Sequence, residues 1–333
     1  MKSEIDVENR AAPTLLIILD GFGLASPKKP GNAITPETAP HIFGYMDEYP
    51  TAKLTAHGSA VGLFPGQEGN SEAGHLNIGT GRIVEQDLVR ISEAIADGTF
   101  YKNEAFKQAL FATKKHKAAV HVMGLLTDEQ SAHARPEHLY ALLDFFRRHD
   151  QKEVYIHLFT DGRDASPHAA VKFLHDLRLH MKNGEKIATI MGRFYAMDRN
   201  KVWKRTEAAY NAMVMGEGNT AASPAEAINQ AYNRGETDEY ILPTVIAENG
   251  KTVTKMSAHD AVYFFNARSD RARQITKAFV QPHFETHNPG AFSRSSHPAH
   301  LGFVAMTDFG PDLAGIFTAF PSPDIDNGLA KAI

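Results

Sequence analysis

Arginine is the residue type whose spacing most clearly suggests chemistry in this sequence. The planar guanidinium group binds phosphate or carboxylate through two parallel hydrogen bonds. Each arginine alone is explained as well by an exposed ion pair, with Asp164, Asp198 or Asp270 as partner, which contributes little stability. Several arginines in one cleft instead favour a small substrate with more than one negative charge. The arginines that follow apolar runs are Arg163, Arg193, Arg199, Arg268 and Arg271.

A serine stands in the glycine-rich segment GQEGNSEAGH, residues 66–75. Glycine lets the backbone approach a ligand closely, and a helix starting at Ser71 would offer amide donors to a phosphate or an oxyanion. The alternative is that Ser71 only caps the N-terminus of that helix, and the local pattern favours neither interpretation. A serine hydroxyl is a weak nucleophile, so catalysis would need an activating base or metal from elsewhere in the chain.

Two further polar residues follow apolar runs. Asp20 comes directly after the run at residues 14–19, where a carboxylate is a suitable ligand for a hard cation. Taken alone, the pair Asp20-Gly21 is better explained as a turn. His133 lies in the loop after the apolar run at residues 118–123, which makes it a candidate site residue.

The hydrophobic pattern predicts the elements that position these residues. Short apolar runs alternate with helical patterns, which indicates an α/β protein with parallel strands joined by helices. In such open sheets ligands bind outside the carboxyl ends of the strands, where the arginines stand. The six predicted strands are residues 14–19, 118–123, 153–159, 186–191, 261–266 and 301–306.

Helix starts and domain boundaries are also predicted. Helices should begin at Pro136, at Ser166 with Pro167, and at Ser223, where Glu226 completes a capping box. A loop at residues 79–86 leads into a helix, and residues 281–300 have the composition of a linker. The sequence between these boundaries would be a unit inserted into a domain formed by the two ends of the chain.

Composition excludes several classes of protein. The chain of 333 residues is 43% hydrophobic and 22% charged, as expected for a folded protein of about two domains. Its net charge of -4 argues against a nucleic-acid binder. The absence of cysteine excludes disulfides, thiolate metal sites and a cysteine nucleophile, and it fits a reducing compartment. The apolar run at residues 15–19 is too short to span a membrane, so no membrane or signal segment is expected.

Six motifs occur in the order LLIILDGFG, GNSEAGHLNIGTGR, FTDGRDASP, GRFYAMDRNKVWKR, RGETDEYILPT and FFNARSDRARQIT. Together they resemble the cofactor-independent (2,3-bisphosphoglycerate-independent) phosphoglycerate mutases of the alkaline phosphatase superfamily. The resemblance implies an alkaline-phosphatase-like domain, incomplete here, with an inserted α/β transferase domain. Residues 1–84 would form the first segment, residues 85–299 the transferase domain, and residues 300–333 the start of the returning segment.

The resemblance also implies roles for single residues. Asp20 would be a manganese ligand, and Ser71 both a metal ligand and the nucleophile that is phosphorylated. A loop histidine and the arginine motifs would bind the substrate, and aligning the histidine requires a one-residue insertion. The substrate-binding residues are then His133, Arg163, Asp164, Arg193, Arg199, Arg268 and Arg271.

The implied reaction interconverts 3-phosphoglycerate and 2-phosphoglycerate in glycolysis and gluconeogenesis, and thus in the cytoplasm, through a phosphoserine at Ser71. It would use two divalent metal ions, with manganese expected and magnesium or cobalt as alternatives, and no 2,3-bisphosphoglycerate. Asp20 and Ser71 cannot complete two metal sites, because such ions take about four to six ligands.

The full metal sites are therefore not expected within this chain. We expect the lone chain to be inactive or to need a separate C-terminal chain as partner, with phosphoglycerates as the small-molecule partners. A protein that binds phosphoglycerate without catalysis is the alternative. Another metal-dependent phosphomutase or phosphatase is a third hypothesis, which GRFYAMDR and FFNARSDRAR disfavour.

Overall fold

The computed structural model describes residues 14–313, 315–322 and 328–332. Within these residues, nine strands form one sheet in the order β4-β5-β3-β2-β1-β7-β8-β9, with β6 paired to β5. The predicted α/β class is confirmed. The strands are β1 (Val120–Leu126), β2 (Val154–Thr160), β3 (Lys186–Gly192), β4 (Asn219–Ala221), β5 (Thr244–Glu248), β6 (Lys251–Thr252), β7 (Ala261–Phe264), β8 (Gly302–Thr307) and β9 (Phe317–Phe320).

The central strands are buried along almost their whole length, and most of their residues are apolar. All seven residues of β1 are buried, and in β2 and β3 only one residue each, Tyr155 and Lys186, is not. Continuous apolar runs are typical of parallel strands that are covered on both faces. The pairings between β1, β2 and β3 and between β1, β7, β8 and β9 are parallel, whereas β5 runs antiparallel to β3 and β6.

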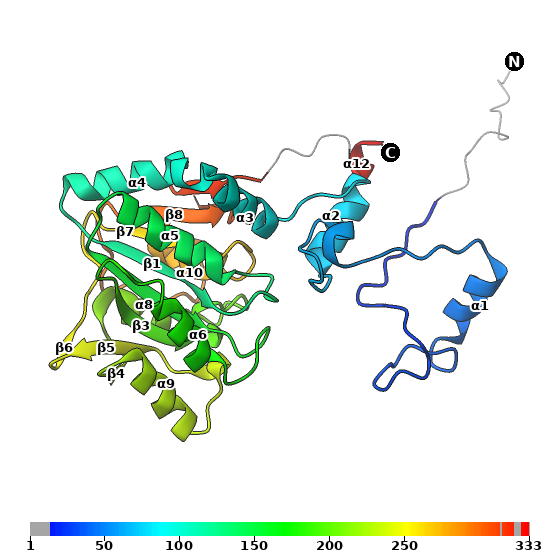
Figure 1. Cartoon of the computed structure of the whole chain (residues 1–333), viewed down its shortest axis with the longest axis horizontal. Helices are drawn as coiled ribbons and strands as arrows, with labels where there is room; N and C mark the ends of the chain where they lie inside the picture. The colour runs from blue at the N-terminus through cyan, green and yellow to red at the C-terminus, as the bar shows by residue number, and fades with distance from the viewer. Residues whose placement is uncertain (1–13, 314, 323–327, 333) are drawn as a thin grey trace, which may run out of the picture.

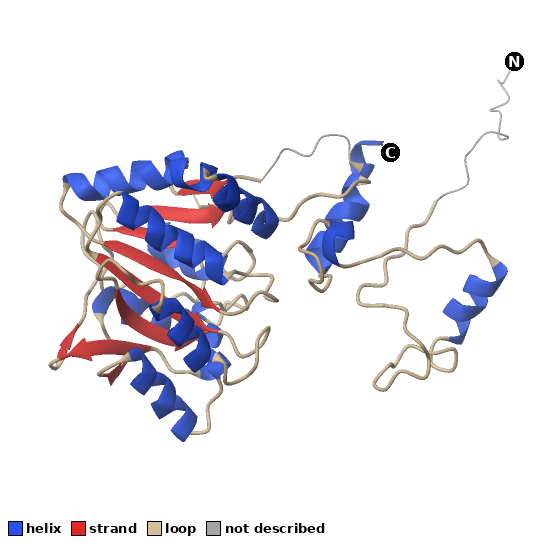
Figure 2. Ribbon diagram, viewed as in Figure 1, coloured by secondary structure: helices blue, strands red, loops and turns tan. Residues whose placement is uncertain are grey.

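Helices cover both faces of the sheet (Figure 2). The path β1–α5–β2–α6–β3 crosses the sheet in one direction and β7–α10–β8 in the other, so right-handed crossovers place α10 on the face opposite α5 and α6. Among the described residues, no helix is both long and apolar enough to cross a membrane. The helices are α1 (Pro40–Glu48), η2 (Gly58–Val61), α2 (Ser71–Thr80), α3 (Asp87–Asp97), η3 (Thr99–Lys102), α4 (Glu104–Lys115), α5 (Pro136–Arg148), α6 (Ala170–Arg178), α7 (Arg193–Ala196), α8 (Trp203–Met215), α9 (Pro224–Asn233), η4 (Asp238–Tyr240), α10 (Arg273–Val280), α11 (Phe284–His287) and α12 (Leu329–Ala332).

The chain reverses its direction across the sheet between the neighbouring strands β1 and β7. Such a reversal opens a crevice at the carboxyl ends of the strands, because the flanking connections leave on opposite faces. The loops on its two sides are joined by hydrogen bonds. The side chain of Asn266 accepts from the amide of Leu125 at 2.8 Å, and the amide of Ala267 donates to the carbonyl of His133 at 2.8 Å.

One predicted strand is wrong. Residues 14–19 form no strand and pair with no strand in the described part of the chain, and Leu15 is 81% exposed. A strand requires a hydrogen-bonding neighbour, and an apolar run alone does not supply one. Figure 1 shows residues 14–50, including α1, lying away from the sheet. The other five predicted strands are confirmed as β1, β2, β3, β7 and β8.

The predicted domain limits after residues 84 and 299 stay predictions. β8 and β9 follow the second limit and continue the central sheet beside β7. The last helix, α12, contacts α2, which precedes the first limit. Residues 1–13 of the predicted first segment, and residues 314, 323–327 and 333 of the last, lie outside the described residues.

Local signals place the helix starts with mixed accuracy. α5 begins at Pro136 as predicted, whereas α6 begins at Ala170, a turn later than predicted, and ends at Arg178. At α9 the hydroxyl of Ser223 accepts from the amide of Glu226 at 3.2 Å. The Glu226 carboxylate accepts from the amide of Ala222 at 2.9 Å, one residue before the amide that a standard capping box uses.

Replacing Ser223 by alanine should lower the free energy of unfolding by about 1 kcal/mol, because a helix-start amide loses its acceptor. Chemical denaturation of both proteins measures this change. The variant Ser223→Asp retains an acceptor and should keep the wild-type stability. Equal losses in the two variants would show that the hydroxyl does not act as a cap.

Candidate functional site

A buried ion-pair network lies at the carboxyl end of the sheet. Arg193, directly after β3, places its Nη1 2.7 Å from Asp161 Oδ1 and 2.9 Å from Asp164 Oδ2, both on the loop after β2. The side chains of Arg193 and Asp161 are only 2% and 1% exposed. Burial alone would lower the pKa of Arg193, but the two carboxylates raise it above its ordinary value. Arg193 is therefore a fixed cation.

The acidic partners of Arg193 are themselves held in place. Thr127, after β1, donates its hydroxyl hydrogen to Asp161, and the other oxygen of Asp161 accepts from the amides of Arg163 at 3.1 Å and Asp164 at 3.0 Å. Ser131 donates to Asp164 Oδ2 at 2.8 Å. Burial pushes the pKa of Asp164 upward, but Arg193, Ser131 and His133 outweigh it and lower that pKa.

His133 lies in the loop after β1 and is 4% exposed. Its Nδ1 is 4.0 Å from Asp270 Oδ1 and makes no hydrogen bond with any described residue. Burial and the nearby Arg193 lower its pKa from 6.5 to about 3, so the imidazole is neutral at physiological pH. A buried nitrogen without a partner is suited to a hydrogen bond with a bound ligand.

The loop after β7 supplies the remaining charged groups. Asp270 pairs with Arg199 at 2.8 Å and lies 3.0 Å from Arg268 Nε, although the geometry of the second pair is not that of a hydrogen bond. Arg271 donates to the carbonyl of Met197 at 3.3 Å. Arg199 and Arg268 therefore share one carboxylate.

The pKa of Arg271 responds to burial and to the charged groups around it. Its pKa is lowered by burial and then by Arg193, Arg199 and Arg163, against the opposing effect of Asp270. These arginines come from the loops after three different strands. Arg163 is the most exposed, with 57% of its side chain accessible, and its Nη1 lies 3.3 Å from Glu239 Oε1. We call Arg163, Arg193, Arg199, Arg268 and Arg271 the arginine cluster.

Ser71 is the first residue of α2, and the helix is capped by Asn70, whose side chain accepts from the amide of Ala73. The interpretation of Ser71 as the capping residue is therefore wrong. Its Oγ donates to Asp20 Oδ2 at 2.8 Å and lies 3.3 Å from His75 Nδ1. The two residues that sequence reasoning assigned to a metal site thus lie in direct contact.

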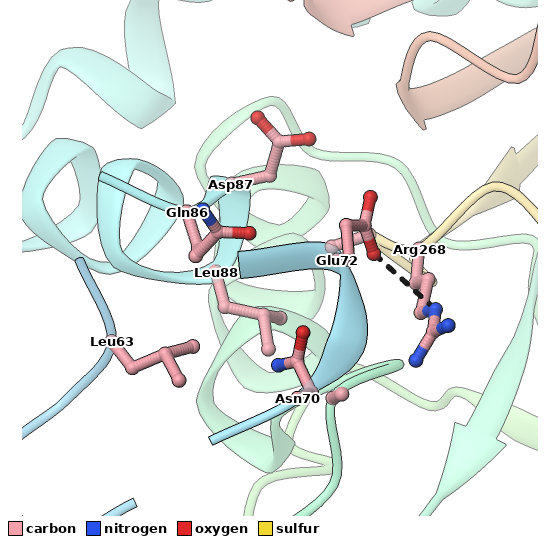
Figure 3. A pocket seen from close by; sticks show the side chains of 9 residues that line it. Leu63, Asn70, Glu72, Gln86, Asp87, Leu88 and Arg268 are labelled. Atoms are coloured by element: carbon pink, nitrogen blue, oxygen red, sulfur yellow. Dashed lines mark ion pairs between the residues drawn. The ribbon is translucent and has the colours of Figure 1, made fainter. Parts of the chain in front are cut away.

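One ion pair links the Ser71 helix to the arginine cluster. Glu72 Oε2 lies 3.3 Å from Arg268 Nε, and Figure 3 shows this pair beside a small cavity of about 30 Å³. Asn70 and Asp87 also line that cavity. The helix that carries Ser71 therefore meets the arginine cluster at this cavity, although Ser71 itself does not line it.

The donors near Ser71 do not form a complete metal site. The described residues contain no group of three or more His, Cys, Asp or Glu side chains that could hold a metal ion. Asp20 and Ser71 are only two ligand residues, with three side-chain oxygens between them, fewer than the four to six ligands that divalent ions usually take. The residues present do not fit a metal by themselves.

Sequence reasoning named the cations of the site and two of their counterions, Asp164 and Asp270, but not Asp161 or Glu72. Asp161 follows β2 directly, so the strand-end position that drew attention to Arg163 applied to it equally. Asp270 was considered only as an exposed partner, yet it contacts Arg199 and Arg268. Glu72 carried no signal, because its contact depends on how α2 meets the sheet.

Much of the chain, including most of these site residues, matches a known protein family. The family model described as BPG-independent PGAM N-terminus matches residues 91–311. The chain belongs to the BPG-independent phosphoglycerate mutase family. Among the relatives, the 2,3-bisphosphoglycerate-independent phosphoglycerate mutases of Clostridium beijerinckii and Moorella thermoacetica are 45% and 46% identical over 323 residues.

The family resemblance seen in the motifs is confirmed. A phosphoglycerate mutase of Leishmania mexicana, solved at low cobalt concentration, shares the fold with a TM-score of 0.73 and 26% identity, over 83% of this chain and 51% of that one. The α/β fold class, with an alkaline-phosphatase-like domain and an inserted transferase domain, is confirmed by this membership. The matches to the two curated mutases cover 96% of this chain, which spans 61% of their length.

Stability should depend on pH through His133. The folded chain accepts this proton only near pH 3, whereas an unfolded histidine accepts it near 6.5, so stability is full above pH 6.5 and falls as the pH drops toward 3. His133→Gln should reduce the slope by up to about 1.4 kcal/mol per pH unit. Chemical denaturation across this range measures the slope, and an unchanged slope contradicts the assignment.

Proposed function

We propose that this chain binds phosphoglycerate and takes part in the interconversion of 3-phosphoglycerate and 2-phosphoglycerate by phosphoryl transfer through Ser71, in the cytoplasm. The observation that carries the proposal is the gathering of arginines from the loops after β2, β3 and β7. Burial lowers the pKa of Arg271, and the nearby Arg193, Arg199 and Arg163 lower it further. Cations held this close repel one another unless an anion lies between them. A ligand with more than one anionic group satisfies several of them at once.

Phosphoglycerate has the charges that this cluster requires. It carries a phosphate at one end and a carboxylate at the other, and arginine forks bind both groups through paired hydrogen bonds. Arg193 Nη1 is paired with Asp161 and Asp164. Arg193 Nε is buried and has no hydrogen-bond partner among the described residues. We assign Arg193 Nε and His133 Nδ1 as hydrogen-bonding groups for the bound glycerate.

The proposed transfer has two steps that together conserve every atom. Ser71 Oγ attacks the phosphorus of 3-phosphoglycerate, the bond from phosphorus to the C3 oxygen breaks, and that oxygen receives the serine proton. The 2-hydroxyl of the retained glycerate then attacks the phosphoserine, and its proton passes to Ser71 Oγ as the phosphorus–Oγ bond breaks. The arginine cluster would hold the glycerate while it turns between the steps.

The metal requirement remains part of the proposal. Two divalent ions, with manganese preferred to magnesium or cobalt, would lower the pKa of the serine hydroxyl and offset the charge of the phosphoryl group. Because Asp20 and Ser71 are only two ligand residues, further ligands would come from polypeptide outside the described residues, either continuous with this chain or on a separate chain. No step above is assigned to a metal. The reaction would use no 2,3-bisphosphoglycerate.

A second candidate function is binding without turnover by this chain alone. It is favoured by the lack, among the described residues, of any group of three or more possible metal ligands. Catalysis and binding without turnover differ in whether a phosphoserine forms at Ser71. Incubation with manganese and 3-phosphoglycerate should give a phosphoserine at Ser71, detected by mass spectrometry, only if the chain reaches the first step of transfer. Ser71→Ala should abolish that phosphate while retaining ligand binding.

Substrate affinity should depend on the arginines after β7. Arg268→Ala and Arg271→Ala should each weaken binding of 3-phosphoglycerate at least about tenfold, since a lost charged hydrogen bond is worth about 1.5–3 kcal/mol. Calorimetric titration measures the dissociation constants. Arg147→Ala is the matched control, because Arg147 lies on α5 and pairs with Asp144. Affinity that is unchanged in the two cluster variants would overturn the binding proposal.

A further inference from the structure

The backbone that carries Arg199 is wrapped around the carboxylate of Asp198, whose side chain is only 2% exposed. Asp198 Oδ2 accepts from the amides of Asn200 at 3.1 Å and Val202 at 3.0 Å. Its Oδ1 accepts from Nη1 of Arg205 at 3.0 Å. A carboxylate that binds amides further along its own chain closes the segment between them into a turn. We call residues 198–202 the Asp198 turn.

Gln274, in the first turn of α10, holds the Asp198 turn from a distant part of the chain. Its Nε2 donates to Asp198 Oδ2 at 2.9 Å and to Thr206 Oγ1 at 2.7 Å. Its Oε1 accepts from the amide of Lys201 at 2.9 Å. The backbone of Lys201 has a φ of 58°, a left-handed conformation that a non-glycine residue keeps only where its surroundings fix it. Gln274 therefore supplies both a donor and an acceptor that fix the turn.

The hydrogen bonds of Gln274 link two loops that carry arginines of the cluster. Arg199 lies within the Asp198 turn, after β3 and α7, whereas Gln274 follows Arg271 closely, where the loop after β7 enters α10. None of these hydrogen bonds involves the guanidinium group of Arg199, whose side chain is 50% exposed and pairs with Asp270 at 2.8 Å. The turn thus fixes the backbone of Arg199 and leaves its charged end accessible to a ligand.

Helix capping does not account for Asp198. A capping residue lies directly before its helix and accepts from an amide of the first helical turn. The N-cap residue of α8 is Val202, and the amides that Asp198 binds, those of Asn200 and Val202, both precede the helix. Asp198 therefore shapes the connection that carries Arg199. A buried polar network whose groups are all satisfied holds a single conformation.

We propose that Asp198 and Gln274 are positioning residues, which hold Arg199 at a fixed separation from Arg271 so that both guanidinium groups reach one bound phosphoglycerate. The inference rests on the proposed function, because it concerns the binding of that ligand. Asp198 and Gln274 would not touch the ligand themselves, since both oxygens of the carboxylate and both ends of the amide already have partners. A turn that is already formed reduces the entropy lost when the ligand orders the loop.

The test replaces Gln274 by methionine, which has a similar shape but cannot form these hydrogen bonds. Calorimetric titration of the whole chain with 3-phosphoglycerate should show a dissociation constant raised at least about fivefold, because the charged contact of Arg199 is misplaced. Gln281→Met is the matched control. Gln281 follows the other end of α10, is also 6% exposed, and its side chain makes hydrogen bonds with Asp312 and Asn288. The control should lose similar stability and keep the wild-type affinity.

A double-mutant cycle separates the positioning of Arg199 from a general loss of structure. If Gln274 acts through Arg199, Gln274→Met should change the affinity less than about twofold in a chain that already carries Arg199→Ala. Additive losses would overturn the proposal, as would wild-type affinity in Gln274→Met when Arg199→Ala alone weakens binding. Equal binding by wild type and Arg199→Ala, or none by either, would contradict the proposed function itself and this inference with it.

The variant Gln274→Glu adds a readout that depends on pH. A protonated carboxyl group can donate to Asp198 and accept from the amide of Lys201, as the glutamine does, whereas an ionised one repels Asp198. Arg205 pairs with Asp198 in both proteins. The dissociation constant of the variant, divided by that of wild type at the same pH, should therefore rise between about pH 5 and pH 9, the range in which a buried carboxyl group ionises. A ratio that stays constant with pH would count against the positioning role of Gln274.

Discussion

The ion pairs of Arg193 with Asp161 and Asp164 are the interaction around which the site is organised. A guanidinium that is 2% exposed can remain charged only beside carboxylates, and those carboxylates need the hydroxyls and amides of two neighbouring loops. The network thereby fixes the loops after β1, β2 and β3 relative to one another. It also sets the electrostatic surroundings of His133, whose pKa is lowered by burial and then by Arg193. Removing one carboxylate would disturb all three loops.

The parts of the structure that depend on local pattern could be predicted from sequence. The buried apolar runs gave five of the central strands, and the rule that ligands bind at the carboxyl ends of such strands brought Arg163, Arg193, Arg199, Arg268 and Arg271 to one edge of the sheet. The short strands β4, β6 and β9 carry two to four residues each, too few for a periodic signal. Residues 14–19 were wrongly predicted as a strand, because a strong apolar run does not specify a neighbouring strand to pair with.

Side-chain partners were the least predictable part of the site. Whether Asp270 lies beside Arg199, Arg268 or neither depends on loop conformations that pair residues far apart in the sequence. The same holds for Asp20 and Ser71, whose contact joins positions 51 residues apart. The spacing of residue types therefore indicated the charge of the ligand, whereas the pairing of each arginine with a particular carboxylate emerged only from the fold.

The link between Glu72 and Arg268 has a consequence for how the site responds to its solvent. The Glu72 side chain is 52% exposed, so dissolved ions reach this pair far more readily than the buried pairs of Arg193. Attraction between exposed charges is screened over about 8 Å at physiological ionic strength. The helix that carries Ser71 is thus attached to the arginine cluster by a contact that salt weakens, while the cluster itself keeps its internal geometry. Higher ionic strength should therefore weaken the contact between Glu72 and Arg268 more than the buried ion pairs of Arg193.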